Sequence, residues 1–338
     1  METLTNIVTF TSNILWSYVL IATLIGCGLW FSFKTGFVQF RMIRHMFGLL
    51  AETGGDKLKS KQNGDKKERK ISSFEAFAVS IAGRVGTGNL AGVATAITIG
   101  GPGAIFWMWL IAMLGSASAF IESTLAQMYK TKGKDSFIGG PAYYIEKGLK
   151  MKWLSVAFAV FTILTFGFAF NSVQSNTLSA AFSEAFNFNP ALMGGIITIL
   201  SAIIFFGGIQ SIAKVSSVIV PIMAIGYVVI ALFVILFNIT ELPDVISCII
   251  SNAFGFEQAV GGGIGAALMQ GIKRGLFSNE AGMGSAPHAA ATANVSHPVK
   301  QGLVQALSVF TDTLLICTCT AFIILFSGAP IDGSVDGV

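Results

Sequence analysis

Two glycine-rich stretches in an otherwise apolar chain carry the residues whose types and spacing could bind a small molecule. The first runs AGRVGTGNLAG over residues 82–92, and it sets Arg84, Thr87 and Asn89 among four glycines. Where such a stretch unwinds a helix, its freed backbone amides can bind a carboxylate. The alternative is an intact helix in which the glycines are packing positions and Arg84 is a structural ion-pair partner. We favour the interrupted helix, whose amides face a substrate carboxylate.

The second stretch runs GGGIGAALMQGIKRGLFSNEAGMGS over residues 261–285. If its helix enters a bilayer at about residue 257, then Gly265, Gln270 and Gly271 lie nearest the midplane, and we expect the helix to be interrupted there. Two glycine-interrupted helices in corresponding positions of two halves are typical of the binding site of a secondary transporter.

Three further polar residues are expected at bilayer depth. Gln174 lies in NSVQSN, where its amide could accept from an ammonium group and donate to a carboxylate, or could form an interhelical hydrogen bond. Glu122 and Asp312 lie deep in apolar runs, where carboxylates are costly unless they are paired or functional. Basic partners for these carboxylates lie in the same kind of segment, at Arg84, Lys273 and Arg274. We expect a charge network of Arg84, Glu122 and Asp312, with ion coordination as the alternative.

The other reactive residue types show no catalytic pattern. The sequence contains no GxxxxGK[ST], which weighs against an ATP-driven pump. It has no nucleophile, base and orienting group at recognisable spacing, so we expect no enzyme and no cofactor. Cysteines and histidines lack metal-ligand or redox spacing, so we expect no metal beyond a coupling ion; they are Cys27, Cys248, Cys317, Cys319, His288 and His297. The modest net charge of +4 does not indicate a nucleic-acid partner.

The composition indicates that these residues belong to an all-α membrane protein. Of the 338 residues, 53% are hydrophobic and 11% are charged, whereas a soluble domain carries about 25% charged residues. Apolar runs of about 18 residues or more predict eight transmembrane helices, at 13–33, 74–98, 103–129, 153–183, 191–208, 215–237, 257–285 and 301–326.

The distribution of Lys and Arg predicts the orientation of these helices. If the N-terminus is external, the loops 34–73, 130–152, 209–214 and 286–300 hold ten, six, one and one of the 21 basic residues, and the external loops hold none. The positive-inside rule therefore makes these loops cytoplasmic. The first helix lacks a basic n-region and a small-residue cleavage site, so we expect it to be retained. Within the first loop, residues 56–70 are expected to be a solvated linker, with contact to anionic lipid as the alternative.

The two interrupted helices divide the chain into related units. Residues 1–33 form an extra helix, and residues 74–237 hold a first repeat of five spans. Five helices that start inside end outside, so the next unit, at 257–326, begins with the opposite topology. The chain then ends in an external tail, at 327–338. This is the arrangement of an inverted repeat.

Three motifs resemble diagnostic stretches of the sodium:alanine symporters, the family of alanine or glycine:cation symporters. GGPGAIFWMWLIAMLG at 100–115 looks like the family signature. GLFSNEAGMGSAPHAAATA at 275–293 and GTGNLAGVATAI at 86–97 resemble two further stretches. The similarity runs from about residue 13 to residue 338.

The resemblance implies an extra N-terminal helix and a leucine-transporter-like core of five plus five inverted helices in a bacterial or archaeal cytoplasmic membrane. It also implies sodium-coupled, less often proton-coupled, uptake of alanine or glycine. By this mapping the substrate carboxylate is held by Gly86, Thr87, Gly88 and Asn89, and the amino group faces Gln174. The mapping further implies cation ligands at Gly83, Thr87 and Asn89, and a side-chain pocket shaped by Gly265, Met269, Gln270 and Phe277.

The chain departs from the family pattern in one respect. Family members continue with three more core helices, whereas this chain stops at Val338 after the eighth span. We therefore expect an incomplete second repeat, half of a cation site to be absent, and no transport by this chain alone. A proton-coupled or glutamine-carrying symporter of the same fold and a non-transporting, ligand-sensing membrane protein remain as alternatives, and the oligomeric state is left open.

Overall fold

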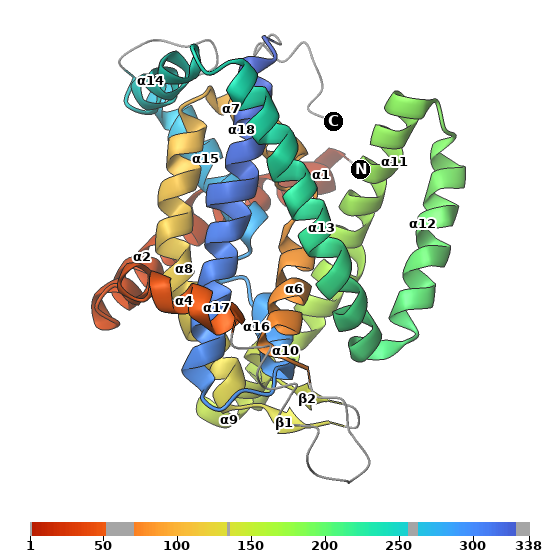
Figure 1. Ribbon diagram of the computed structural model, residues 1–338. Coiled ribbons are helices and arrows are strands. Elements are labelled where there is room, and N and C mark those ends of the chain that lie inside the picture. The colour runs from red at the N-terminus through yellow and green to blue at the C-terminus, as the bar shows by residue number, and fades with distance from the viewer. Residues whose placement is uncertain (1, 52–70, 134–135, 256–262, 329–338) are drawn as a thin grey trace.

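A computed structural model describes residues 2–51, 71–133, 136–255 and 263–328. Within these ranges the regular structure is helical apart from an antiparallel hairpin of β1 (Thr131–Lys132) and β2 (Phe137–Ile138). Figure 1 shows most helices running between two ends of the molecule. We call one the hairpin end, where β1, β2 and α9 (Pro141–Gly148) lie, and the other the α14 end, after α14 (Leu242–Ala253).

The N-terminal helix is continuous through α1 (Glu2–Ile14), a π-helical turn η1 (Leu15–Val19) and α2 (Leu20–Lys34). It packs on α8 (Ala104–Met128) at Gly28, where a Cβ atom would lie 3.1 Å from the Leu114 carbonyl oxygen. The predicted loop 34–73 begins with two short helices, α3 (Val38–Arg41) and α4 (Ile43–Ala51). Residues 52–70, which include the predicted linker, lie outside the described residues.

The second predicted span is divided in two, as the sequence predicts. Ser72 begins α6 (Ser73–Arg84) with a capping box, in which its hydroxyl accepts from the Glu75 amide and the Glu75 carboxylate accepts from the Ser72 amide at 2.9 Å. Helix α6 ends at Arg84, and α7 (Ala91–Gly100) resumes after the non-helical residues 85–90.

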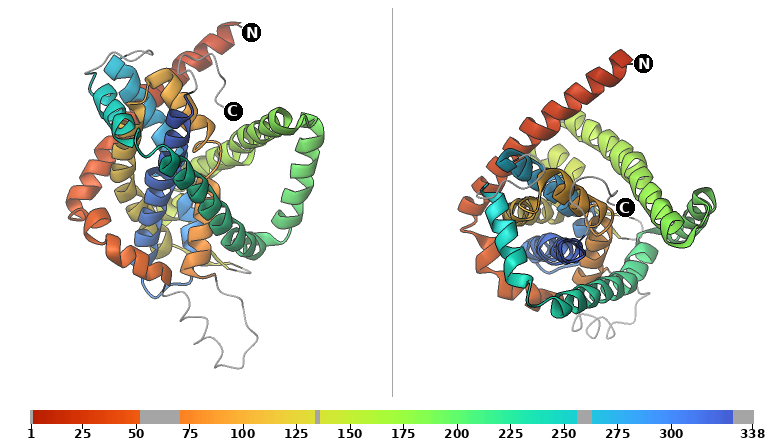
Figure 2. Two further views of the ribbon diagram at one scale, coloured as in Figure 1. Left: turned by 45° about the horizontal axis from the view of Figure 1, so that its top comes forward. Right: turned by 90° about the horizontal axis from the view of Figure 1, so that it is seen from above.

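Three helical segments form the centre of the molecule: α8, α15 (Gly263–Asn279), and the continuous helix of α17 (Pro298–Val309), η3 (Phe310–Cys317) and α18 (Thr318–Phe326). Glycine lets them approach closely, since a Cβ atom at Gly271 would lie 2.4 Å from the Ala104 carbonyl oxygen, and one at Gly302 would lie 2.7 Å from that of Phe120. Figure 2 shows α13 (Gly208–Phe237) and α14 curving around one side of α18.

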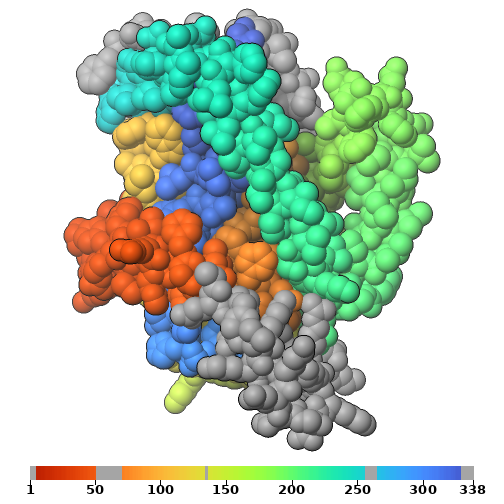
Figure 3. Space-filling view, in the orientation of Figure 1, coloured from red at the N-terminus to blue at the C-terminus, as the bar shows by residue number. Residues whose placement is uncertain are grey.

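The segment from α10 to α12 lies at the periphery. Helix α10 (Lys152–Leu164), the π-helical turn η2 (Thr165–Phe170) and α11 (Asn171–Phe186) are continuous, and α12 (Pro190–Phe205) returns beside them. Figure 3 shows α11 and α12 separated from α13 by a groove over the upper part of that face. Their large apolar side chains are exposed, including Phe186 at 67% and Phe205 at 68%. An apolar surface of this kind is suited to lipid.

The observed helices agree in part with the predicted spans. Among the described residues, five continuous helices are long and apolar enough to cross a membrane: Thr5–Lys34, Ala104–Met128, Lys152–Phe186, Gly208–Phe237 and Pro298–Phe326. Each corresponds to a predicted span, although the one predicted at 215–237 begins earlier, at Gly208. Helix α12 is a shorter apolar helix, and α14 has no counterpart among the predicted spans. The total of eight spans and the inverted-repeat relation remain predictions.

Candidate substrate and cation site

The first break, residues 85–90, folds into a turn that Asn89 closes. The Asn89 Oδ1 atom accepts from the Gly86 amide at 2.9 Å, and the Asn89 amide donates to the Gly86 carbonyl oxygen at 3.1 Å. The Thr87 amide donates to Gln174 Oε1 at 3.1 Å, so α11 reaches the turn through a side-chain amide. The Thr87 hydroxyl is buried and has no partner in the described part of the chain. The structure thus brings together Gly86, Thr87, Gly88, Asn89 and Gln174.

Two of the glycines in this turn closely approach other elements, Gly86 a flexible side chain and Gly88 the backbone of α15. A Cβ atom at Gly86 would lie 2.6 Å from Gln174 Nε2, and one at Gly88 would lie 3.0 Å from the Ser278 Cα atom. Gly83, in contrast, has nothing within 4 Å of its Cβ position and is exposed. Its assignment as a cation ligand stays a prediction.

The second break lies at residues 280–285 and not where the sequence predicts it. Helix α15 runs unbroken through Gly265, Gln270 and Gly271, so the predicted interruption there is wrong. The glycines in the actual break, Gly282 and Gly284, have φ angles of 83° and 84°, which glycine adopts without a steric cost. Helix α16 (Ala286–Thr292) then resumes.

Phe277 is the predicted pocket residue of α15 that reaches the first break. Its ring stacks on that of Phe170 with centroids 5.1 Å apart, and its Cδ1 atom would lie 3.2 Å from a Cβ atom at Gly88. Gln270 instead lies beside Gly100 at the far end of α7, with its Cβ atom 3.0 Å from the glycine's Cβ position. The structure does not bring Gly265, Met269 or Gln270 to the first break, because they lie earlier on an unbroken helix.

Glu122 of α8 holds the second break. Its Oε1 atom accepts from the Gly282 amide at 3.2 Å. Within the break, the Ser285 hydroxyl donates to the Glu280 carboxylate. A Cβ atom at Gly282 would lie 2.6 Å from the Leu24 Cδ2 atom, so the N-terminal helix α2 also supports this break.

Asp312 connects the first break with α15. Its Oδ1 atom accepts from Asn89 Nδ2 at 2.8 Å, and its Oδ2 atom accepts from the hydroxyls of Ser278 at 2.8 Å and Thr313 at 3.0 Å. The carboxylate is completely buried. The same Asn89 side chain that folds the break therefore also binds this carboxylate.

The π-helical turn η3 adds a thiol to this cluster. The Cys317 Sγ atom lies 3.3 Å from Asn89 Nδ2 and 3.2 Å from the Ser278 hydroxyl oxygen. Residues five apart are separated by about 140° around an α-helix, whereas i→i+5 bonding in a π-helical turn brings them to nearly the same face. Helical periodicity therefore could not have predicted that Cys317 and Asp312 face the same site. Ser278 and Thr313 were also missed, although both are neighbours of predicted features.

The expected charge network is not made of direct ion pairs. Arg84 Nη1 donates to the Ser308 hydroxyl and, at 3.4 Å, to the Gln305 carbonyl oxygen. Glu122 and Asp312 bind the neutral donors described above, and in the described ranges no carboxylate lies within ion-pair distance of Arg84. Asp312, Glu280 and Glu122 act on Arg84 as longer-range charges, and the charge network of Arg84, Glu122 and Asp312 stays a prediction.

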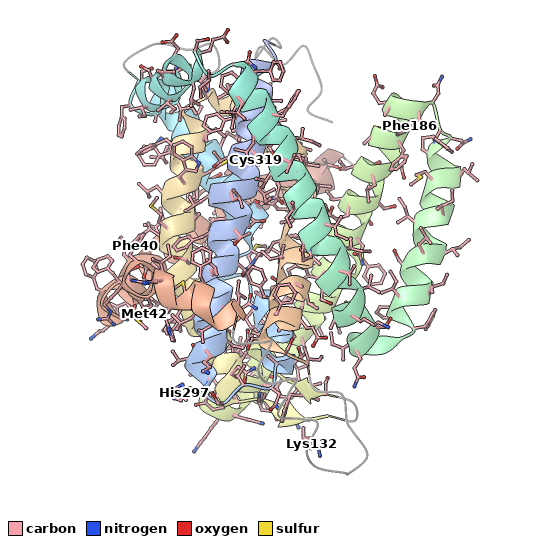
Figure 4. All side chains as sticks on the ribbon, viewed as in Figure 1. Phe40, Met42, Lys132, Phe186, His297 and Cys319 are labelled. Carbon is pink, nitrogen blue, oxygen red and sulfur yellow. The ribbon has the colours of Figure 1, made fainter. Side chains whose placement is uncertain are left out.

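A cavity of about 700 Å³ extends from the breaks toward the hairpin end. Near the breaks it is lined by Gln174, Phe170 and Glu280, and toward the hairpin end by Ile138 and Tyr143. Figure 4 places Lys132 and His297 at that end, and Phe186 near the opposite end of α11. The site therefore has a path to one end of the molecule.

Lys130 and Gln127 attach the end of α16 to α8. The Lys130 ammonium donates to the Ala293 carbonyl oxygen at 2.7 Å and to Gln127 Oε1 at 2.6 Å, and it lies 4.1 Å from the Phe137 ring centroid. Gln127 Nε2 donates to the same Ala293 oxygen at 3.0 Å. Burial lowers the pKa of Lys130 to about 8. These bonds fix the segment that follows the second break.

Replacing Lys130 should loosen this attachment. We expect Lys130→Met to lower the unfolding temperature of the detergent-solubilised protein, because two carbonyl acceptors lose a donor, at about 1 kcal/mol for each bond. Lys214→Met, on an exposed part of α13, is the control and should leave that temperature unchanged.

The stability that Lys130 contributes should also depend on pH. The pKa of Lys130 in the folded protein is below the ordinary value of 10.5, because burial disfavours the charged amine. Between about pH 8 and pH 10.5 the amine is neutral in the folded protein and still charged in the unfolded chain, so the free energy of unfolding rises with pH. The advantage of the wild type over Lys130→Met should therefore grow in that range; a constant or shrinking difference would contradict the assignment.

These features define a class of protein. Broken helices at the centre of a multi-pass apolar bundle, with amides, a carboxylate and a cavity meeting at the breaks, are the features of a transporter and not of an enzyme. Residues 1–338 match the sodium:alanine symporter family, and the chain belongs to that family.

Several relatives match the chain over almost its whole length. GlnT of Bacillus subtilis, a probable sodium/glutamine symporter, is 54% identical over 337 residues, covering all of this chain and 69% of GlnT. The amino-acid carrier protein AlsT of the same organism is 51% identical over 339 residues, covering all of this chain and 70% of AlsT. The sodium/alanine symporter AgcS of Methanococcus maripaludis is 39% identical over 329 residues, covering 96% of this chain and 71% of AgcS. The expectation of an incomplete second repeat stays a prediction.

Proposed function

We propose that this protein couples sodium entry to the uptake of a small neutral amino acid, alanine or glycine, across the cytoplasmic membrane. The observation that carries the proposal is the shared role of Asn89, which folds the first break and binds the Asp312 carboxylate. A substrate held by the turn and a cation held by Asp312 would both act on this one side chain. Such sharing is a physical basis for coupling, because each ligand then orders a residue that the other needs.

The substrate carboxylate is assigned to the turn of the first break. The amides of residues 87 and 88 and the unpartnered Thr87 hydroxyl are its donors, while the Gly86 amide stays on Asn89 Oδ1. The Thr87 amide now binds Gln174 Oε1, and a carboxylate that took this donor would release the Gln174 oxygen to accept from the substrate ammonium. The stacked rings of Phe170 and Phe277 would form an apolar wall against which the substrate side chain packs. The small side chain of alanine or glycine suits this closely packed region.

The cation is assigned to Asp312. Its carboxylate and the hydroxyl oxygens of Ser278 and Thr313 are hard oxygen ligands of the kind that alkali cations prefer. Both hydroxyls now donate to Asp312, and they would turn their lone pairs toward a cation at this place. Asn89 Nδ2 donates to Asp312 and Asn89 Oδ1 accepts from the Gly86 amide, so in this arrangement Asn89 would act on the cation through its hydrogen bond to Asp312. Direct ligation by Asn89 stays a prediction. The predicted Thr87 and Gly83 contributions belong to the same proposal.

Gln174→Ala tests the assignment of the ammonium group. We expect an alanine Kd raised about tenfold or more, because one charge-assisted hydrogen bond, worth about 1.5–3 kcal/mol, is lost. Asn176→Ala, an exposed amide on the same helix, is the control and should bind as the wild type does. An unchanged Kd in Gln174→Ala would remove this residue from the site.

Binding of radiolabelled alanine to the purified protein, with sodium or with choline as the only cation, tests the function. We expect saturable binding that requires sodium and that glycine displaces. Equal binding in choline would contradict sodium coupling, and displacement by glutamine at a lower concentration than by glycine would favour a glutamine carrier such as GlnT. Flux in proteoliposomes then separates a transporter from a ligand sensor, and a requirement for a pH gradient alone would favour proton coupling.

The membrane arrangement completes the proposal. We place the N-terminus outside, the basic loops and the hairpin end in the cytoplasm, and the two broken helices in inverted repeats of a leucine-transporter-like core. The positive-inside count supports this orientation. The cavity would then connect the site with the cytoplasm.

A further inference from the structure

Arg84 is a buried cation that lacks a countercharge at contact distance. The side chain is 2% exposed, and its Nε and Nη2 atoms have no hydrogen-bond partner in the described ranges. A guanidinium left in this way in an apolar interior costs several kcal/mol. Arg84 stands at the end of α6, next to the first break, so its position can be set by the state of the site.

Arg84 lies in a polar seam between α6 and α17. The seam consists of Ser80 and Arg84 on α6, and Gln301, Gln305 and Ser308 on α17, all of them buried. Several of its polar atoms are unpartnered, namely Ser80 Oγ, both side-chain polar atoms of Gln301, and Gln305 Nε2. Of these atoms, Ser80 Oγ and Gln301 Oε1 can accept from a guanidinium, so the seam offers Arg84 acceptors besides the two that it now binds.

The charges around the seam favour a cation and disfavour an anion. Asp312, Glu280 and Glu122 all act electrostatically on Arg84. An anion bound beside Arg84 would therefore be repelled by three carboxylates. Glu122 is engaged by the Gly282 amide and Glu280 by the Ser285 hydroxyl, both in the second break. Asp312 lies one helical turn beyond Ser308, which Arg84 now contacts, a rise of about 6 Å. Glu122 and Glu280 are thus bound within the second break, whereas Asp312 follows the present partner of Arg84 by one turn of the same helix.

We propose that the Arg84 guanidinium is a tethered counter-cation of Asp312 that competes with sodium for this carboxylate. The inference rests on the proposed sodium site. With sodium at Asp312, the guanidinium stays on Ser308 and Gln305; without sodium, it moves along the seam and neutralises Asp312. Arg84 is therefore a positioning residue that lowers the sodium affinity and keeps the buried carboxylate from being left uncompensated.

The test is equilibrium binding of ²²Na⁺ to the purified protein and to variants along the seam. Arg84→Gln removes the competitor and should lower the sodium Kd about tenfold, whereas Arg84→Lys should stay near the wild type. Ser308→Ala removes the anchor that holds the guanidinium away from Asp312 and should raise the Kd about threefold or more. In the double variant Arg84→Gln/Ser308→Ala, the sodium Kd should equal that of Arg84→Gln alone, because no guanidinium is left for Ser308 to hold. Arg274→Gln removes a partly buried cation of α15 that, unlike Arg84, is not among the charges acting on Asp312, and it should not change the Kd.

The outcomes separate this inference from the proposed function. If the wild type binds no sodium, the proposed function fails and the inference fails with it. If the wild type binds sodium but Arg84→Gln leaves the Kd unchanged or raises it, or Ser308→Ala tightens binding, only the inference is overturned. Should Arg84→Gln not yield a monodisperse protein, the Ser308→Ala result decides: a raised sodium Kd supports the inference, and an unchanged or lowered sodium Kd overturns it.

Discussion

Asp312→Asn should abolish sodium-dependent alanine binding, with the sodium Kd raised at least about 100-fold, or about 2.7 kcal/mol. The substitution keeps the size of the side chain and an oxygen acceptor, but it removes the negative charge in the cluster of Asn89, Ser278, Thr313 and Cys317. In a dry interior a cation depends on that charge, since neutral oxygens alone do not repay its lost hydration. Titration of the purified variant with ²²Na⁺ measures the effect directly.

Cys317→Ala is the matched control for Asp312→Asn. It removes another member of the same cluster without changing the charge, and it should leave sodium dependence intact. A Kd for sodium that is the same in Asp312→Asn and in the wild type would show that the cation binds elsewhere.

Gly88→Ala should eliminate alanine binding, whereas Gly86→Ala should only weaken it and Gly83→Ala should have little effect. The new methyl group at residue 88 would lie 3.0 Å from the Ser278 Cα atom, so either the first break or α15 would have to shift. At residue 86 the methyl group would meet the Gln174 amide at 2.6 Å, and a long side chain can rotate away. At residue 83 nothing lies within 4 Å of the added atom.

The alanine Kd of each glycine variant measures this effect. The structure predicts the largest increase in Kd for Gly88→Ala, a smaller one for Gly86→Ala and the smallest for Gly83→Ala. All three are Gly→Ala changes within one short stretch, so the added group is the same in each and only its surroundings differ. An equal loss in all three, or a larger loss at residue 83 than at residue 88, would contradict the geometry of the first break.

The first break could be predicted from sequence because its cause is local. Four glycines and three polar residues within residues 82–92 conflict with an intact apolar helix, and the helix does end at Arg84. The second break was predicted from the expected midplane, which placed it at Gly265 to Gly271. Of those positions, Gly271 serves packing, as does Gly275 one turn later, since both face the backbone and side chains of α8, whereas nothing lies within 4 Å of the Cβ position of Gly265. Sequence alone does not separate a packing glycine from one that needs a positive φ angle, as Gly282 and Gly284 do.

The candidate site was predicted in part for a related reason. Residues in the turn of the first break are neighbours in sequence, and Gln174 was recognised as an amide in an apolar helix. Ser278 and Cys317 could not be assigned, because their contact with Asp312 depends on how α15 and η3 pack together. Helix α14 was missed since its 12 residues are too few for a predicted span. Arg84 was recognised as unusual, but its partners on α17 are more than 200 residues away in sequence.

The extra residue in the π-helical turn η3 fixes the rotational setting of everything that follows it. An α-helix that kept the same residues through 310–317 would advance every later residue by one position, which rotates α18 by about 100°. The Thr318 hydroxyl, which accepts from the Trp109 indole at 2.8 Å, and the Thr320 hydroxyl, 2.7 Å from that of Tyr227, would both turn away from their partners. The wide turn is therefore as strict a requirement of this span as the identity of its residues, and the span could lose its extra residue only together with the π-helical turn.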